Sequence, residues 1–283
     1  MRTPTGARDG VEGRPQMASG LLDAFFVPEP VLLERGHGFA LFGPEHRMAL
    51  GICLVCAGLL VHRYTCLPKG LAWGRPRRRM LLALAVIPLA LLASRDVAAA
   101  VLGLLSPIFW PLHICNFCEY LALAFVLTCD RPAAHVVGEL FFAWSATGAL
   151  AALLFPGWSY CPLWTYASLG GFVEHTLLLV MVWAPVLGGD FVPRRCHLWI
   201  PLVAAIVGGA LFRPFNAAFG TNFFFVTHPL VGTPFEWLSD TWGNPGYLVP
   251  YLLLSCLLWA GWHALAAYVS QCGGRGLRRT DPR

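Results

Sequence analysis

Residues 165–187 read TYASLGGFVEHTLLLVMVWAPVL, and this stretch decides the fold class. Among its side chains only Glu174 and His175 are acidic or basic. An α-helix rises about 1.5 Å per residue, so a run of this length crosses the ~30 Å hydrocarbon core of a bilayer. The stretch therefore predicts a membrane-spanning helix.

The composition of the whole chain points the same way. Of its 283 residues 57% are hydrophobic and 12% are charged, whereas soluble domains have about 45–50% apolar and about 25% charged residues. The mean hydropathy is +0.61. One core cannot bury this much apolar surface, so part of it must face lipid. The same numbers exclude a disordered chain, and ten cysteines are too sparse for a disulfide scaffold.

Six further apolar runs predict an all-α, polytopic membrane protein with about seven transmembrane helices. The expected spans are residues 46–64, 80–105, 110–129, 136–155, 165–187, 198–212 and 247–269. They form a single transmembrane domain over residues 46–270, between a polar N-terminal tail (1–45) and a basic cytoplasmic tail (271–283). Arg95 and Asp96 interrupt the second span, where their opposite charges can offset each other.

The basic residues set the expected orientation. With the N-terminus outside, thirteen of the twenty Lys and Arg residues lie on the inner side, so the positive-inside rule favours N-out, C-in. This distribution orients a multi-pass protein of the plasma or inner membrane. We expect membrane lipids and not nucleic acid as partners, and the oligomeric state is left open.

Polar side chains from five segments share one membrane depth near the outer face in this orientation. Ionisable groups within spans are costly, so each is by default a functional hypothesis. These residues are His46, His113, Cys115, His175, Asn216, Asn222 and His228. Their common depth predicts a site that opens to the outer leaflet.

Cys115 is the candidate nucleophile of this site. Pro111 suits the first turn of a helix, which would put Cys115 about one turn in. The amides and the dipole at that helix end favour a thiolate. His175 is the candidate base. Glu119, one turn after Cys115, is a better supporting residue than Glu174, which points about 100° away from His175 on a helix.

Two other interpretations use the same residues. A lone Cys in an apolar helix is usually a small filler side chain. His113, Cys115, Cys118 and His175 could offer nitrogen and sulfur ligands, but a CxxC inside a helix places its thiols on adjoining faces and there is no HxxxH, so we predict no metal and no cofactor. His197 and His263 are interpreted as interfacial.

Four strings carry a resemblance to a known family: FALFGPEHRMAL (39–50), WPLHICNF (110–117), NAAFGTNFFFVTHP (216–229) and WGNPGYLVPYLL (242–253). With the lone His175, they resemble the YwaF-like integral membrane family, which includes the eukaryotic transmembrane protein 164. The resemblance covers the chain from Phe39 to the last span.

The eukaryotic branch is similar to a phospholipid acyltransferase that uses a Cys and a His in the membrane, and more distantly to hydrolases of fatty acid esters of hydroxy fatty acids. The resemblance implies these roles for Cys115 and His175. This sequence departs from the eukaryotic pattern directly after Cys115, where it has Asn116 and Phe117 in place of a polar pair.

These observations leave two hypotheses. In the first, a lipid acyltransferase or acyl-ester hydrolase uses Cys115 as nucleophile and His175 as base. Asn222, together with the first amides of the third span, would stabilise the oxyanion, and His113, His46 and Asn216 would bind substrate. In the second, a non-catalytic transporter or lipid-binding protein lines the same pocket with these residues. Concentration of the polar groups near one face favours a one-sided pocket.

Overall fold

A computed structural model describes residues 25–35, 38–70, 74–229 and 233–278. Most of the predicted N-terminal tail and the last residues of the basic tail lie outside these ranges. Seven of the helices are long and apolar enough to cross a membrane, and the described residues contain no strand. The predicted all-α, polytopic fold is therefore confirmed. The elements are α2 (Glu29–Arg35), α3 (Pro44–Thr65), α4 (Arg75–Val101), η2 (Pro107–Phe109), α5 (Ile114–Leu127), α6 (Ala133–Leu154), α7 (Tyr166–Gly188), η3 (Arg195–His197), α8 (Trp199–Phe219), η4 (Phe223–Phe225), α9 (Pro234–Trp242) and α10 (Leu248–Arg278).

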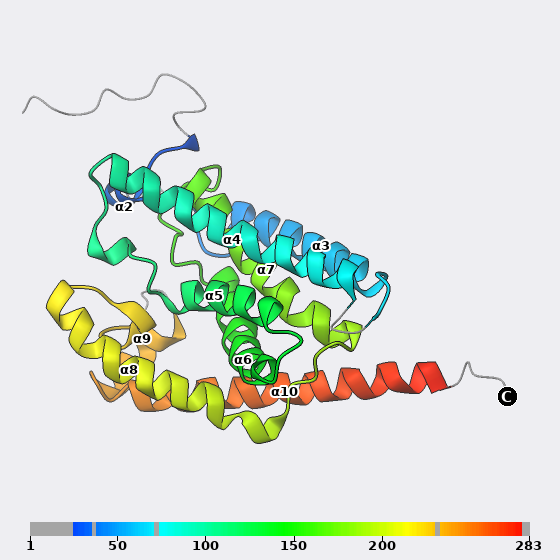
Figure 1. The fold of residues 1–283 in the computed structure, drawn as a ribbon. Coiled ribbons are helices and arrows are strands. Elements are labelled where there is room, and N and C mark those ends of the chain that lie inside the picture. The colour runs from blue at the N-terminus through cyan, green and yellow to red at the C-terminus, as the bar shows by residue number, and fades with distance from the viewer. Residues whose placement is uncertain (1–24, 36–37, 71–73, 230–232, 279–283) are drawn as a thin grey trace, which may run out of the picture.

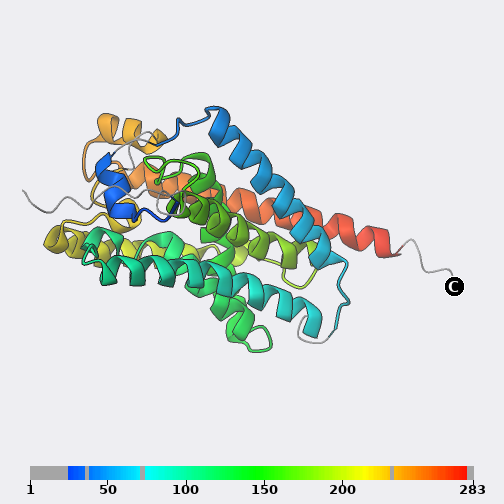
Figure 2. The ribbon, with the colours of Figure 1, turned by 90° about the horizontal axis from the view of Figure 1, so that it is seen from above.

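Helix α7, the span that decided the fold class, lies at the centre of the bundle. In its most apolar window 72% of the residues are buried, against 11% for α3 and α8. Figure 1 shows α3 and α4 on one side of α7, α8 and α10 on the other, and α5 and α6 between them. Seen from above, the axes of α3, α4 and α10 are broadly aligned, and the chain runs along α4 in the direction opposite to that of α3 and α10 (Figure 2).

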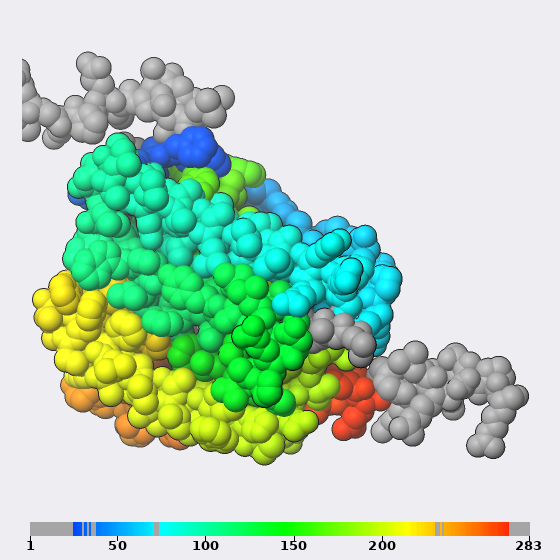
Figure 3. Space-filling model, in the orientation of Figure 1, coloured from blue at the N-terminus to red at the C-terminus, as the bar shows by residue number. Residues whose placement is uncertain are grey.

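The apolar surface divides into a packed interior and an outward surface. The last turn of α5 is buried through Phe125 and Val126, and α7 is buried through Met181. Outward-facing residues such as Leu54 on α3 and Leu257 on α10 are 75% and 70% exposed. A helix bundle that exposes so much apolar surface is suited to a lipid environment. Helices α4, α5, α6 and α8 share the face seen in Figure 3.

Several boundaries differ from the expected spans. Helix α4 begins at Arg75, so the arginines expected in a loop form its first turns. Helix α8 runs to Phe219 and not to residue 212. Arg213 interrupts the apolar run of this helix, and its guanidinium donates a hydrogen bond to the Val226 carbonyl (2.8 Å). Short helices α2 and α9 also occupy segments expected to be tail and loop.

The start of α5 corrects a second expectation. The helix begins at Ile114, so Pro111 lies before it and not in its first turn. The side chain of Asn116 accepts a hydrogen bond from the His113 amide (3.1 Å), which makes His113 the N-cap. Cys115 is consequently the second residue of α5, closer to the positive end of the helix dipole than the sequence predicted.

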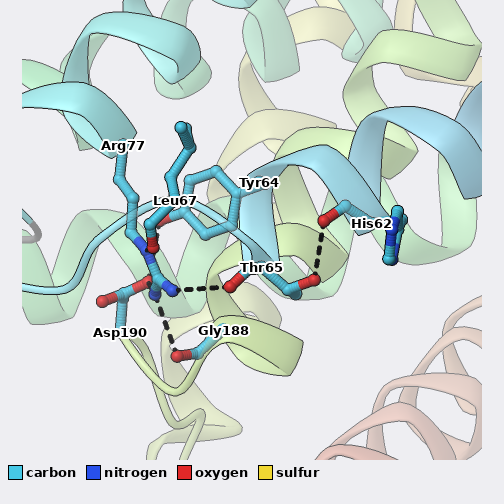
Figure 4. Close-up of polar contacts among 7 residues, drawn as sticks. All are labelled: His62, Tyr64, Thr65, Leu67, Arg77, Gly188 and Asp190. Atoms are coloured by element: carbon cyan, nitrogen blue, oxygen red, sulfur yellow. Dashed lines mark hydrogen bonds and ion pairs between the residues drawn. The ribbon is translucent and has the colours of Figure 1, made fainter.

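A buried ion pair lies at the end of the bundle where α4 begins and α7 ends (Figure 4). Arg77 of α4 is 1% exposed, and its guanidinium contacts Asp190 at 2.5 Å. The Tyr64 hydroxyl of α3 also donates to Asp190 (2.9 Å). The Arg77 guanidinium lies 5.0 Å from the centre of the Tyr64 ring. Three further guanidinium hydrogens go to the backbone oxygens of Thr65, Leu67 and Gly188. This anchor joins α3, α4 and the end of α7.

Candidate functional site at the outer end

Ionisable groups from three spans, buried or half-buried, lie within electrostatic range of one another at one end of the bundle. We call this the outer end, because the count of basic residues places it outside. Arg95 of α4 interacts electrostatically with Cys115 of α5 and with Glu174 of α7. It also interacts with Glu119 and with His175. We call Arg95, Cys115, Glu119, Glu174 and His175 the outer polar cluster.

Cys115 is the second residue of α5. It is half-buried and lies in the first turn, where backbone amides have no carbonyl of the same helix to pair with. Its thiol interacts electrostatically with Arg95 and with the carboxyl groups of Glu119 and Glu174. The amides, the dipole and Arg95 all favour negative charge at the sulfur, while the carboxylates oppose it.

His175 is 4% exposed and has a defined ring orientation. Its Nδ1 donates to the Gly171 carbonyl (2.7 Å). Because a carbonyl oxygen only accepts, Nδ1 carries the hydrogen, and in a neutral ring Nε2 is then the proton acceptor. The ring stacks on Trp158 with centroids 4.9 Å apart and planes at 29°. Among the described residues no hydrogen bond joins His175 to Cys115, although both interact with Arg95.

Glu119 is 1% exposed, and neither of its carboxyl oxygens has a hydrogen-bond partner within the described part of the chain. Buried polar atoms are normally paired, and those that are not call for an explanation. Glu119 comes from the same face of α5 as Cys115, one turn on. A carboxyl group in this state is available to a bound polar group inside the cluster.

Arg95 links the cluster to a surface hollow. Its guanidinium lies 3.6 Å from Asp96 and 3.6 Å from Glu29 of α2, so the expected compensation by Asp96 is present and a second carboxylate adds to it. Glu29 also accepts from the Tyr160 hydroxyl (2.7 Å). Burial and the Glu29 charge raise the pKa of Tyr160, so the hydroxyl keeps its hydrogen. The hollow, about 240 Å³, is lined by Glu29, Arg95 and Asp96 together with residues of α2, α4 and α7.

The other expected site residues are engaged elsewhere. His46 is fully buried, accepts from the Phe42 amide at Nδ1 (2.9 Å) and pairs through Nε2 with the Leu153 carbonyl (2.9 Å). Asn216 exchanges two hydrogen bonds with the backbone of Phe223, both 2.9 Å. These side chains join α3 to α6 and α8 to η4.

Asn222 and His113 flank the same aromatic segment. The Asn222 side chain donates to the His228 carbonyl (2.8 Å) and accepts from the amides of Thr227 and His228, both at 3.2 Å. It thereby closes its own loop. The His113 ring lies edge-on to Phe223, with centroids 4.8 Å apart. Cys115, Glu119 and His175 thus all lie within electrostatic range of Arg95, while Asn216, Asn222 and His46 bind backbone groups elsewhere.

A second polar group, missed in the sequence, lies at the inner end. Glu139 of α6 is fully buried and pairs with His263 of α10 (3.0 Å). His135 and His197 approach the other oxygen of the same carboxylate. The expectation that His263 is interfacial is wrong, since it is 0% exposed. The spacing of His135 and Glu139, four residues apart on one helix face, is the signal that could have found this group.

The fold and its exposed apolar surface define a multi-pass integral membrane protein. The chain belongs to the TMEM164 family, whose model matches residues 41–263. The match runs from just before α3 into α10 and includes Cys115 and His175. No curated protein and no solved structure matches the chain.

Proposed function

We propose that the protein is a lipid acyltransferase or acyl-ester hydrolase of the plasma or inner membrane that acts from an outer-leaflet pocket. Cys115 passes its proton to His175 and attacks the acyl carbonyl, so that a C–S bond forms and the ester C–O bond breaks. His175 returns the proton to the departing lipid alcohol. A lysolipid hydroxyl or water, deprotonated by His175, then attacks the thioester and releases Cys115.

The observation that carries this proposal is the outer polar cluster. Buried ionisable groups within spans are expensive, and here α4, α5 and α7 each contribute one or more to a single neighbourhood. The nucleophile lies at a helix N-terminus, and the base presents Nε2 as its acceptor. Arg95 and the first amides of α5 supply the positive potential that a developing oxyanion requires.

A groove between α3 and α7 supports a lipid as the substrate. It has a volume of about 210 Å³. Its walls include Ile52, Phe172 and Leu177. Phe172 packs on Trp158, the residue that stacks on His175, with ring centroids 5.5 Å apart. An acyl chain in this groove would lie near Trp158, on which the proposed base His175 stacks.

Transport is the weaker alternative, because an apolar layer separates the polar groups of the two ends. In α4 buried Leu84 and Leu92 lie between Arg77 and Arg95. In α7 Thr176 is followed by buried apolar residues, including Leu177, Leu178 and Met181. A substrate path needs polar groups at successive depths, which these spans do not offer.

The test is lipid turnover by the full chain in nanodiscs that contain a phospholipid acyl donor and a lysophospholipid acceptor. Mass spectrometry follows acyl transfer and release of free fatty acid. We expect Cys115→Ala and His175→Ala each to lower turnover by at least about 100-fold, the lower range of general-base contributions. Cys256→Ala, which removes a half-buried thiol on α10, serves as the control.

Two outcomes would overturn the proposal. If both variants kept wild-type turnover, the cysteine and histidine would have no part in the reaction. If the wild-type protein bound lipid and altered none, a non-catalytic lipid-binding function would replace the enzyme.

A further inference from the structure

At the inner end, two histidines and a glutamate converge on one point. His135 and Glu139 lie four residues apart in the first turns of α6, and His197 comes from η3. One ligand atom from each lies within 4.8 Å of the other two. Helices α6 and α10 run side by side here (Figure 1). Three chain segments far apart in sequence therefore meet around one carboxylate.

The distances fit metal coordination. Glu139 Oε1 lies 3.4 Å from His135 Nδ1 and 3.2 Å from His197 Nδ1. Bonds of about 2.0–2.2 Å in a tetrahedral site put neighbouring ligand atoms roughly 3.3–3.6 Å apart. His135 Nδ1 is shielded from solvent and makes no hydrogen bond in the described part of the chain, although it faces the Glu139 carboxylate. A cation between a buried ring nitrogen and a carboxylate that are not hydrogen-bonded to each other explains this geometry.

Hydrogen bonds from neighbouring residues fix the position of the Glu139 carboxylate. His263 Nε2 contacts the other oxygen, Oε2, at 3.0 Å, and its Nδ1 donates to the Trp259 carbonyl (2.7 Å). The Arg194 amide donates to Oε1 (2.7 Å). His197 Nδ1 is hydrogen-bonded to the same oxygen (3.2 Å), and a bound cation would take the place of the hydrogen between them. Partners of this kind orient ligands and are part of most metal sites.

The site reaches the molecular surface. The side chains of His135 and His197 are 34% and 29% exposed, while Glu139 is fully buried. Two imidazoles and one carboxylate leave a position free on a four-coordinate metal, and this donor set suits Zn²⁺ and neighbouring first-row divalent ions. Ca²⁺ and Mg²⁺ prefer all-oxygen ligands.

We propose that His135 Nδ1, Glu139 Oε1 and His197 Nδ1 bind one divalent transition-metal ion at the inner end of the bundle, with His263 positioning Glu139. This site is separate from the outer polar cluster. It differs from the sequence-level candidates His113, Cys115, Cys118 and His175, and the sequence predicted no metal at all.

Cobalt binding by the full chain tests the proposal. The detergent-solubilised protein is stripped with a chelator and titrated with Co²⁺, whose visible absorption reports the ligands and geometry, and Zn²⁺ is then added as competitor. We expect one equivalent per chain. His135→Ala and His197→Ala should each lower affinity by more than the about 10–100-fold that loss of a supporting residue costs. His228→Ala, an exposed histidine at the other end, should bind like wild type.

Thermal unfolding separates a lost site from a lost fold. Both variants replace partly exposed side chains, so the chelated proteins should melt near the chelated wild type. Zn²⁺ should raise the melting temperature of the wild type and not of His135→Ala. Absence of Co²⁺ binding by the wild type, wild-type affinity in both variants, or a thiolate-to-cobalt band that signals cysteine ligation would each overturn the proposal.

Discussion

His175 and Gly171 are joined by a 2.7 Å hydrogen bond in which the imidazole Nδ1 donates to the carbonyl one turn earlier. Gly171 has a second effect on the same ring. A Cβ at this position would lie 2.6 Å from the Trp158 ring, on which His175 stacks. The backbone carbonyl at position 171 therefore determines which nitrogen of His175 accepts a proton, and the lack of a Cβ there lets Trp158 approach closely.

Gly171→Ala should displace Trp158 and lower stability by about 1–3 kcal/mol, the usual cost of overpacking. Gly170 is the matched control, because a Cβ there meets no atom within 4 Å. Gly170→Ala should stabilise the helix by about 0.5–1 kcal/mol. Denaturant unfolding in detergent measures both. Equal stability of the two variants would show that the contact of Gly171 with Trp158 does not constrain the fold.

Arg77→Leu should cost about 3–5 kcal/mol, because it leaves Asp190 buried without its cation. The neighbouring Arg78 pairs with Asp130 at 3.8 Å in a partly exposed position. Arg78→Leu should therefore cost less than about 1 kcal/mol. The same unfolding measurement compares them, and similar losses would contradict the assigned anchor role of Arg77.

The spans could be predicted because hydropathy alone reveals them, and the misplaced boundaries have local causes. Helix α8 continues past the predicted end because the polar side chains of Arg213 and Asn216 pair with residues 223–226. Helix α5 starts late because Asn116 caps it at His113. Such contacts are tertiary or depend on one hydrogen bond, so no hydropathy window contains them.

Glu29→Ala should loosen α2 from the bundle. It removes the contact with Arg95 and the acceptor of the Tyr160 hydroxyl. Limited proteolysis of the full chain should then cut residues 25–43 several-fold faster. Glu34→Ala, at an exposed position of the same helix, is the control and should leave the rate unchanged. Unchanged cleavage in Glu29→Ala would mean that other contacts hold α2.

Arg95→Gln should lower the reactivity of Cys115 towards an acyl-mimicking probe about tenfold. The substitution removes a positive charge that favours the thiolate form of Cys115. Arg95→Lys keeps the charge and should recover part of this loss. Rates of probe labelling measure both variants. If the two substitutions behaved alike, the charge of Arg95 would not be its contribution.

The outer site could be predicted in part. A cysteine and a histidine at one membrane depth were enough to nominate Cys115 and His175. The central position of Arg95 was not visible, because its partners Glu29, Glu119 and Glu174 come from three other helices. The group around Glu139 was missed for the same reason, since His263 lies 124 residues away in sequence.

The most direct test of the proposed chemistry labels the purified protein with an acyl-mimicking thiol probe and locates the modified cysteines by mass spectrometry. Cys161 is a control at the outer end, because burial and the Glu29 charge raise its pKa to about 12 and keep it a thiol. Exposed Cys66 and Cys196 give the rate of ordinary thiols. We predict that Cys115 is labelled first and that His175→Ala slows its labelling at least tenfold. Labelling of Cys115 no faster than that of Cys66 and Cys196, and unchanged in His175→Ala, would contradict an activated cysteine and histidine pair.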